Sequence, residues 1–323
     1  MSDMRTAFAQ TATALIEEDP RAAVVLAEIS ADMFGEAAAR HPDRVLNVGI
    51  REQLMVSVSG GLALAGMRPI VHTYAPFLVE RAFEQVKLDL AHQGTHAVLA
   101  SIGASWDAAS SGRTHQAPED VALIDTVPGF GVQVPGHPDE VPSLLREAYR
   151  RLGRDSGAGS GSGAGFGSGS GAGSGGTSTY LRLSTEVNRE ALPLRPGLQV
   201  VRPGHQAVVI AVGPMLSPVL SAVGDLDVTV AYTTTVRPFD AEGLRFVAGS
   251  AGGTVVLVEP YLAGTSAAEV SAALSGRAHR LLSLGVPRAE LRQYGTPADH
   301  AAAYGLDAAG IRRSVASFLE LAS

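Results

Sequence analysis

Short apolar runs alternate with amphipathic stretches along the first half of the chain. From residue 77 to 89, apolar residues recur three and four positions apart, which is typical of a helix with one buried face. The short runs suit strands that are buried on both faces. They lie at residues 23–26, 45–48, 69–72, 97–102, 132–134 and 180–183. The first half is therefore predicted to alternate strands with helices.

The alternation resumes after residue 205 and ends in a predicted helix at 307–321. The predicted strands of this half lie at 207–212, 228–232, 255–258 and 281–284. Strands separated by helices favour parallel pairing through right-handed crossovers. The sequence therefore predicts an α/β protein with two doubly wound domains and mainly parallel sheets. Ligands of such sheets bind at the carboxyl ends of the strands, where segments 49–52 and 103–115 are expected to lie.

A low-complexity segment interrupts the first half. Residues 157–176 contain only Gly, Ser and Ala apart from Phe166, and such a chain cannot bury enough surface to offset its ordering entropy. Residues 179–183 resemble a strand that completes the preceding sheet. We therefore expect a disordered insertion at 155–178 inside the first domain. Such an insertion destabilises the fold little, because loop-closure entropy grows only logarithmically with length.

The junction between the two predicted domains lies after this insertion. Three prolines and scattered charges fall between residues 187 and 203, which suits an extended connector. We expect a first domain at 1–190 and a second at 204–323.

Composition narrows the possible functions. The 323 residues carry 25 Lys and Arg against 32 Asp and Glu, without a basic cluster that could neutralise phosphates, so nucleic acid is not an expected partner. The sequence has no uninterrupted apolar run of about 18 residues and no basic start before an apolar segment. We expect a cytoplasmic protein that does not associate with membranes. The absence of cysteine excludes disulfides and thiolate catalysis.

Glu52 is the most informative residue of the chain. The apolar run at 45–48 leads through Gly49 into a predicted helix, so this carboxylate stands where a strand meets a helix. An acid at a helix N-terminus that faces a cleft can exchange a proton with a bound heterocycle. Residues 112–116, Gly-Arg-Thr-His-Gln, supply a second polar group. Together these segments indicate thiamine diphosphate chemistry.

Seven segments resemble motifs of the transketolase family in order and spacing. They are Asn-Val-Gly-Ile-Arg-Glu-Gln at 47–53, Gly-Gly-Leu-Ala at 60–63, Pro-Phe-Leu at 76–78, Gly-Arg-Thr-His-Gln at 112–116, Val-Arg-Pro-Phe-Asp at 236–240, Val-Glu at 258–259 and Tyr-Gly-Leu at 304–306. The resemblance covers nearly the whole chain apart from the Gly/Ser insertion. The sequence does not contain the Gly-Asp-Gly motif that holds magnesium and the diphosphate in full-length members. The chain thus resembles the second subunit of a split transketolase, with the pyrimidine-binding and C-terminal domains.

The resemblance implies roles for four residues. Glu52 matches the glutamate that hydrogen-bonds the aminopyrimidine nitrogen of the cofactor and promotes the tautomer that removes the thiazolium proton. Phe77 matches the aromatic residue that stacks on this ring, and Phe83 lies near a second aromatic position of some members. His115 matches the histidine that contacts the donor sugar near its reactive carbonyl. Core packing is the alternative role for both phenylalanines and suits the helical spacing of Phe83 equally well, and an isolated glutamate here would more often cap a helix.

Four departures from the family pattern bear on the substrate. Ser111 replaces an acidic residue, Arg113 replaces a proline, and Gly103 stands where a second sugar-binding histidine is usual. Thr185 replaces the arginine that contacts phosphate, which removes a bidentate anion ligand. Arg113 is the candidate substitute for that ligand. If it does not take this role, the resemblance leaves an unphosphorylated or atypical ketose or oxo acid as substrate.

The resemblance also implies a partner. The expected activity is transfer of a two-carbon ketol group from a ketose to an aldehyde, with a separate N-terminal transketolase subunit that holds the diphosphate and magnesium, in an α2β2 assembly. This chain is expected to ligate no metal itself. Three alternatives stay open: the β subunit of a 2-oxo acid dehydrogenase, a deoxyxylulose-phosphate-synthase-like enzyme, and a non-catalytic scaffold or regulatory relative. The Thr-His-Gln motif disfavours the first, and the altered phosphate ligands disfavour the second.

Overall fold

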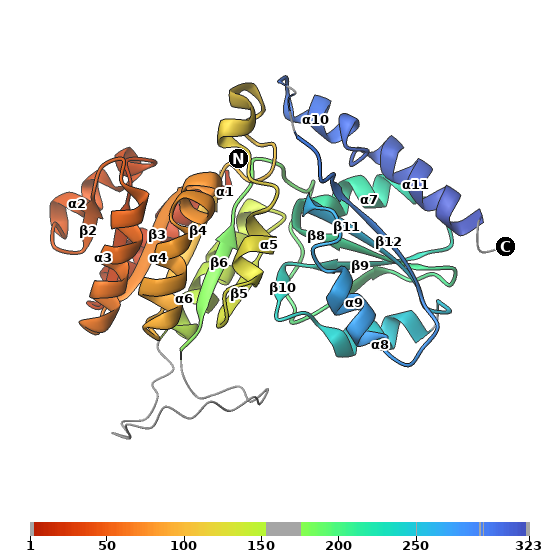
Figure 1. Cartoon of the computed structure of the whole chain (residues 1–323), viewed down its shortest axis with the longest axis horizontal. Helices are drawn as coiled ribbons and strands as arrows, with labels where there is room; N and C mark the ends of the chain where they lie inside the picture. The colour runs from red at the N-terminus through yellow and green to blue at the C-terminus, as the bar shows by residue number, and fades with distance from the viewer. Residues whose placement is uncertain (1–2, 153–175, 250, 291, 293, 321–323) are drawn as a thin grey trace.

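Two sheets lie side by side, and helices cover both faces of each (Figure 1). The computed structural model describes residues 3–152, 176–249, 251–290, 292 and 294–320. All strands within each sheet pair in parallel except one at an edge of each sheet. The predicted α/β class with two doubly wound, mainly parallel sheets is confirmed.

The first sheet has seven strands in the order β10-β5-β6-β4-β3-β1-β2. They are β1 Ala22–Leu26, β2 Val45–Asn47, β3 Arg68–Tyr74, β4 Val98–Ile102, β5 Phe130–Gln133, β6 Ser178–Arg182 and β10 Thr235–Arg237. Only β10 is antiparallel to its neighbour. The predicted strands of the first half are all present, and β1, β4 and β6 are buried along their whole length, as expected of strands with helices on both faces.

Alternate residues of these strands face different helices. Val24 packs in the cluster formed with α1 Met4–Glu18 and α6 Val141–Arg151, whereas Val25 packs with α3 Glu52–Leu64 and α5 Asp120–Asp125. The predicted helix near 77–89 is a series of turns on the α3 side, named η2 Pro76–Arg81, α4 Phe83–Gln85 and η3 Val86–His92. Wide π-type turns form η2 and η3. Four short helices complete this half: η1 Ala31–Phe34, α2 Gly35–Arg40, η4 Ala109–His115 and η5 Pro138–Glu140.

The second sheet has five strands in the order β12-β11-β8-β9-β7. They are β7 Gln199–Arg202, β8 Val208–Val212, β9 Thr229–Thr233, β11 Thr254–Leu262 and β12 Arg280–Val286. Its helices are η6 Gly213–Met215, α7 Leu216–Ala222, α8 Ala241–Gly249, α9 Ala267–Ala273, α10 Pro297–Ala303 and α11 Ala308–Glu320. The sequence predicted an extended connector where β7 lies. This strand was missed because it is a short edge strand that leaves Val200 exposed.

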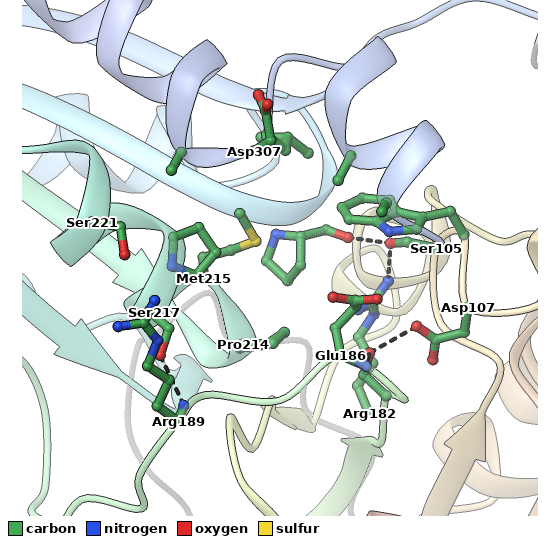
Figure 2. Close-up of a pocket in the computed structure, with 18 residues that line it drawn as sticks. Ser105, Asp107, Arg182, Glu186, Arg189, Pro214, Met215, Ser217, Ser221 and Asp307 are labelled. Carbon is green, nitrogen blue, oxygen red and sulfur yellow. Dashed lines mark hydrogen bonds between the residues drawn. The ribbon is translucent and has the colours of Figure 1, made fainter. Parts of the chain in front are cut away.

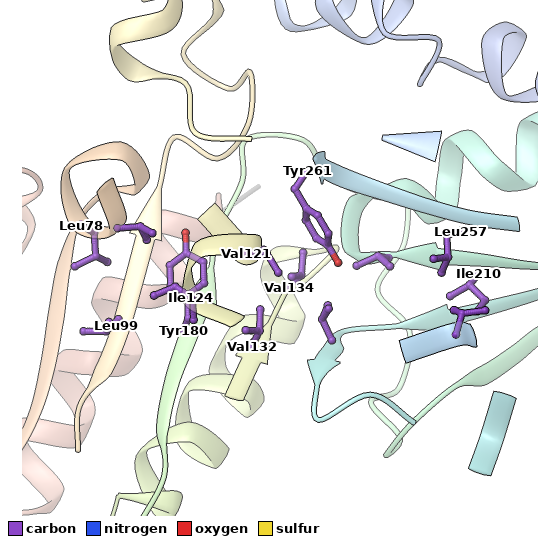
Figure 3. Packing of buried hydrophobic residues seen from close by; sticks show 14 of the residues in the cluster. Leu78, Leu99, Val121, Ile124, Val132, Val134, Tyr180, Ile210, Leu257 and Tyr261 are labelled. Carbon is purple, nitrogen blue, oxygen red and sulfur yellow. The ribbon is translucent and has the colours of Figure 1, made fainter. Parts of the chain in front are cut away.

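The two sheets are tied together. Strand β10 comes from the second half of the chain and pairs with β5 of the first sheet. One continuous apolar cluster runs from Leu78 and Tyr180 to Ile210 and Leu257 of the second sheet (Figure 3). A backbone hydrogen bond also crosses this junction: the Leu262 amide of β11 donates to the Pro118 carbonyl at 2.7 Å, which satisfies both polar groups.

The predicted disordered insertion at 155–178 lies almost wholly outside the described residues. Strand β6 follows it and lies between β4 and β5 in the first sheet, so the chain on both sides of the insertion belongs to one sheet. Among the residues that the structure describes, no helix is long and apolar enough to cross a membrane.

Candidate active site

The Glu52 carboxylate is buried at the N-terminus of α3. The chain leaves β2 through Gly49, whose φ of 71° is a conformation that glycine adopts without steric penalty. This turn brings Glu52 to the first helical position, where only 2% of the residue is exposed. The partial positive charge of a helix N-terminus favours a carboxylate there. The position that the sequence predicted for Glu52, between a strand and a helix, is the one observed.

Arg81 is the ion-pair partner of this carboxylate. Its Nη1 atom donates to Glu52 Oε2 at 2.9 Å. The same guanidinium lies over the ring of Phe77, with Cζ 4.2 Å from the ring centroid. Both residues belong to η2, where positions four apart share one side of the helix. Arg81 was not predicted as a site residue, because it lies in none of the sequence motifs.

Three aromatic rings meet beside this pair. The Phe77 and His115 centroids are 5.2 Å apart, and Tyr74 lies 6.0 Å from Phe77 and 5.6 Å from His115, all edge to face. Phe77 belongs to η2, His115 ends η4 and Tyr74 ends β3. His115 Nδ1 is 2.9 Å from the Thr114 hydroxyl. The structure thus brings the predicted residues Phe77 and His115 into contact and adds Tyr74 to them.

Phe83 and Arg113 stand apart from this cluster. Phe83 begins α4 and is partly buried, and among the described residues no ring contact joins it to Phe77 or His115. The Arg113 guanidinium is paired with Glu119 and donates to the Gln116 carbonyl at 2.6 Å. Its predicted role as a substrate ligand therefore requires it to leave partners in its own loop.

The Tyr74 ring lies directly against Gly103. A Cβ atom at Gly103 would lie 2.2 Å from Tyr74 Cδ1, and Gly103 has a φ of 70°. No side chain fits there unless the tyrosine ring moves. The Tyr74 ring therefore occupies space that a residue larger than glycine would need at position 103.

A cavity of about 400 Å³ opens next to Tyr74 and Gly103. Thr185 and Ser184 line its far side, and Arg5 from the start of α1 lines it as well. Arg5 Nε donates to the Ser30 hydroxyl at 2.7 Å, and that hydroxyl is 2.9 Å from His72 Nε2. No motif in the sequence pointed to Arg5.

His72 is held as a neutral imidazole. Its Nδ1 atom is 2.9 Å from the Ala100 carbonyl, which can only accept, so Nδ1 carries the proton and Nε2 accepts from Ser30. Complete burial, with a smaller effect of the charge on Arg5, lowers the pKa of His72 to about 4. The hydrogen bonds therefore run in one direction, from Arg5 Nε to Ser30, from the Ser30 hydroxyl to His72 Nε2, and from His72 Nδ1 to the Ala100 carbonyl.

Asp107 separates this cavity from another between the two sheets. Its carboxylate accepts from the Ser184 hydroxyl at 2.8 Å and the Thr185 amide at 2.9 Å, and burial raises the pKa of Asp107 to about 6. The second cavity has a volume of about 330 Å³, and Glu186, Arg189 and Met215 line it (Figure 2). It contains none of the residues predicted from the sequence to be catalytic or to bind the cofactor.

A buried ion pair fixes the wall between the two cavities and the core. Arg182 Nε donates to Asp120 Oδ2 at 2.7 Å, and both side chains are almost fully buried. Arg182 also donates to the Ser105 hydroxyl at 2.6 Å, and Ser105 donates to the Pro260 carbonyl of β11 (Figure 2). A carboxylate, a guanidinium and a hydroxyl thus connect the first sheet to the second without a charge left unpaired.

No group of three or more acidic or histidine side chains suited to a metal ion occurs within the described part of the chain. The predicted absence of metal ligands in this chain stays a prediction, because the described residues do not include every residue.

Each half of the chain matches a known protein family. Residues 1–157 match the family described as the transketolase pyrimidine binding domain, and residues 197–311 match the family described as the transketolase C-terminal domain.

Two curated relatives show different coverage. An uncharacterised 33.6 kDa protein of the fasciation locus of Rhodococcoides fascians is 49% identical over 98% of this chain and 95% of its own length. The 1-deoxy-D-xylulose-5-phosphate synthase of Paraburkholderia xenovorans is 33% identical over 87% of this chain. The alignment covers only 42% of that synthase.

Solved structures show the same division. A split-gene transketolase, described as an inactive β4 tetramer, superposes with a TM-score of 0.79 at 25% identity over 98% of both chains. The transketolase of Leishmania mexicana superposes with a TM-score of 0.73 at 19% identity, over 98% of this chain and 45% of its own length.

Proposed function

The chain belongs to the transketolase family, and from that premise we propose that it is the pyrimidine-binding subunit of a split, thiamine-diphosphate-dependent transketolase. With a separate subunit, it would transfer a two-carbon ketol group from a ketose to an aldehyde. The coverage of relatives supports this division, since the chain spans 45% of a transketolase but 98% of a split-gene transketolase chain.

The observation that carries the proposal is the pairing of a buried carboxylate with an aromatic face. A planar N–C–N group, the Arg81 guanidinium, contacts Glu52 and covers Phe77 at once. An aminopyrimidine has a planar N–C–N edge and an aromatic face of its own. The residues of this corner therefore suit the pyrimidine half of thiamine diphosphate, with Glu52 toward the ring nitrogen and Phe77 against the ring.

When bound, thiamine diphosphate supplies a carbon nucleophile for the sugar carbonyl. The protein residues hold and move protons around it. Glu52 shares a proton with the pyrimidine nitrogen, and its burial strengthens that hydrogen bond because the surroundings have a low dielectric constant. Stacking on Phe77 adds about 0.5–1.5 kcal/mol and orients the ring. The sequence also predicts a contact from Phe83, which would require α4 to approach the ring.

His115 is the proposed contact to the sugar. Its Nδ1 atom is engaged by Thr114, so Nε2 is the nitrogen left to hydrogen-bond the carbonyl oxygen of the donor. The neighbouring cavity beside Tyr74 would accept the sugar chain. Arg5 is the arginine that lines this cavity, and it offers an anionic group of the substrate a ligand that Thr185 cannot supply. Arg113 could take that role only after it leaves Glu119.

We further propose that the partner subunit holds magnesium and the diphosphate, in an α2β2 assembly located in the cytoplasm. The related split-gene chain is described as inactive when it forms a β4 tetramer. By analogy, this chain without its partner would be inactive. A partner that completes a buried active site would bury at least about 1,600 Å² in total.

A second candidate is an enzyme that makes 1-deoxy-D-xylulose 5-phosphate. Several curated relatives at 31–34% identity carry that name. The corner formed by Glu52, Phe77 and His115 would serve either reaction, so the two candidates differ in the substrates that the cavity beside Tyr74 admits.

The proposed role of Glu52 is tested by thiamine proton exchange. In the complex with the partner subunit, thiamine diphosphate and magnesium, Glu52→Gln should slow exchange of the thiazolium proton by about 10²-fold or more, because amide nitrogen cannot exchange a proton as the carboxylate does. Hydrogen–deuterium exchange followed by NMR measures this rate.

Glu84→Gln is the matched control, since Glu84 is an exposed acid on the neighbouring α4. It should leave the rate unchanged. Exchange in Glu52→Gln as fast as in the parent would show that the carboxylate has a different role.

A further inference from the structure

We propose that Arg81 is an internal substitute for the cofactor's pyrimidine ring. In the free subunit its guanidinium occupies the place between Glu52 and Phe77, and it must leave before the ring can bind. This inference rests on the proposed function and adds a gating residue to it.

The geometry of the guanidinium carries the inference. It makes both contacts that the pyrimidine would make: an N–H donated to Glu52 at 2.9 Å and a stacked position 4.2 Å from the centre of Phe77. A ring and a guanidinium cannot both cover the same face of Phe77 and take the same Glu52 oxygen. Occupancy by Arg81 and by the pyrimidine is therefore mutually exclusive at these contacts.

The surroundings of Glu52 show why a substitute is needed. A carboxylate that is 2% exposed is costly to leave without a partner. The described hydrogen bonds of its side chain come from Arg81. Arg81 thus keeps the acid paired until the pyrimidine arrives, and the site need not fold around an unpaired charge.

Arg81 also has a route out of the site. Its side chain is 42% exposed, and it ends η2, where the helix is wound with wide turns before α4 begins at Phe83. A long side chain at such a position can rotate into solvent without moving the backbone. The exchange of Arg81 for the ring is therefore a change of side-chain rotamer.

The consequence is a competition that weakens cofactor binding. Only the fraction of molecules with Arg81 swung out is able to bind, and the apparent affinity falls by that fraction. If Arg81 occupies the site about nine-tenths of the time, its removal raises the affinity about tenfold.

The test uses the full-length chain and the hydroxymethyl-aminopyrimidine portion of thiamine as probe. Titration by calorimetry or ligand-observed NMR compares the parent with Arg81→Met, which keeps an apolar side chain of similar length without N–H donors. We expect Arg81→Met to bind the probe about tenfold more tightly. Arg81→Gln, which is shorter and retains an amide, should show an increase of smaller size.

Arg146→Met is the matched control. Arg146 also pairs with a glutamate, through two hydrogen bonds to Glu18 at 2.6 and 2.7 Å, but it lies on the surface of α6. It should bind the probe as the parent does. Far-UV circular dichroism and thermal unfolding establish that each variant is folded before titration.

The outcomes separate this inference from the proposed function. If the parent binds the probe through Glu52, so that Glu52→Gln weakens binding, but Arg81→Met binds equally or more weakly, Arg81 is not a competitor and the inference is overturned. If neither the parent nor Arg81→Met binds the probe, and thiamine diphosphate with the partner subunit shows no dependence on Glu52, the proposed function fails first and the inference fails with it.

Discussion

His72 is a buried residue whose ionisation state affects the stability of the fold. The pKa of His72 is about 4 in the fold, against about 6.5 in an unfolded chain. The unfolded chain therefore takes up a proton first as the pH falls. The stability that neutral His72 provides is fully present above pH 6.5 or so and is lost between about pH 6.5 and 4.

We predict that acidification from pH 7 to 4.5 removes about 2.5 kcal/mol of the free energy of unfolding through this residue. Urea unfolding at both pH values measures the change. In His72→Gln, which cannot titrate, the loss should be smaller by that amount. His205→Asn is the control, because His205 is exposed and pairs with Asp227 on the surface. A loss that is the same in His72→Gln and the parent would contradict the assignment.

The sequence indicated some of the individual residues of the candidate site. Glu52, Phe77 and His115 lie in ordered motifs, and motifs report residues whose chemistry requires one side chain at one place. Arg81 and Arg5 have no motif, because each reaches the site through the direction of a long side chain. Spacing in a sequence does not encode that direction. The clash between position 103 and Tyr74 likewise depends on two segments that meet only in the folded chain.

The helix that begins with Glu52, α3, packs closely against η3. The helix carries neighbouring glycines with opposite surroundings. A Cβ atom on Gly60 would lie 2.6 Å from the Asp89 carbonyl oxygen, whereas a Cβ atom on Gly61 would meet nothing within 4 Å. Asp89 also accepts from the Ser57 hydroxyl at 2.5 Å, so the contact between the two helices is close along this side.

The pair gives a matched prediction. Gly60→Ala should destabilise the fold by about 1–3 kcal/mol, because the methyl group forces the helices apart. Gly61→Ala should be neutral or stabilise it by up to about 1 kcal/mol, since alanine is the better helix former. Chemical denaturation of both variants measures the difference. If Gly60→Ala were as stable as Gly61→Ala, the helices would not be packed as described.

The sequence predicted strands well where helices bury both faces of the strand. The apolar runs of β1, β4 and β8 are buried along their whole length, and such runs stand out in a sequence. Strands β7 and β10 were not predicted, because they are short, antiparallel and at sheet edges, where pairing depends on the neighbouring strand. The π-type winding of η2 was missed for a related reason: the periodicity of apolar residues marks a helix but not the width of its turns.

Three large apolar side chains on and next to α3 form part of the exposed surface of the molecule. Ile50, next to Glu52, is 73% exposed, and Leu64 at the end of α3 is 65% exposed. Leu54 on the same helix is exposed as well. Exposed large apolar side chains can mark association surfaces. Ile50 and Leu54 lie at the Glu52 end of α3, which suits a partner that covers this end of the helix, whereas Leu64 lies at the other end.

The two sheets are joined firmly enough to present that surface as one body. Strand β10 extends the first sheet from the second half of the chain, and the pair of Arg182 with Asp120 is linked through Ser105 to β11. The sequence predicted two domains, at 1–190 and 204–323, and its length and composition carry no information about a strand that crosses between their sheets. The shared core holds the corner formed by Glu52, Phe77 and His115 in a fixed position relative to the second sheet.

The proposed function requires that this chain hold only one half of an active centre. Calorimetric titration with thiamine diphosphate and magnesium, together with an assay of ketol transfer, tests it on the purified chain, on a diphosphate-binding transketolase subunit, and on their mixture. We expect only the mixture to bind the cofactor tightly and to transfer the ketol group. Tight cofactor binding and turnover by the purified chain alone would contradict it.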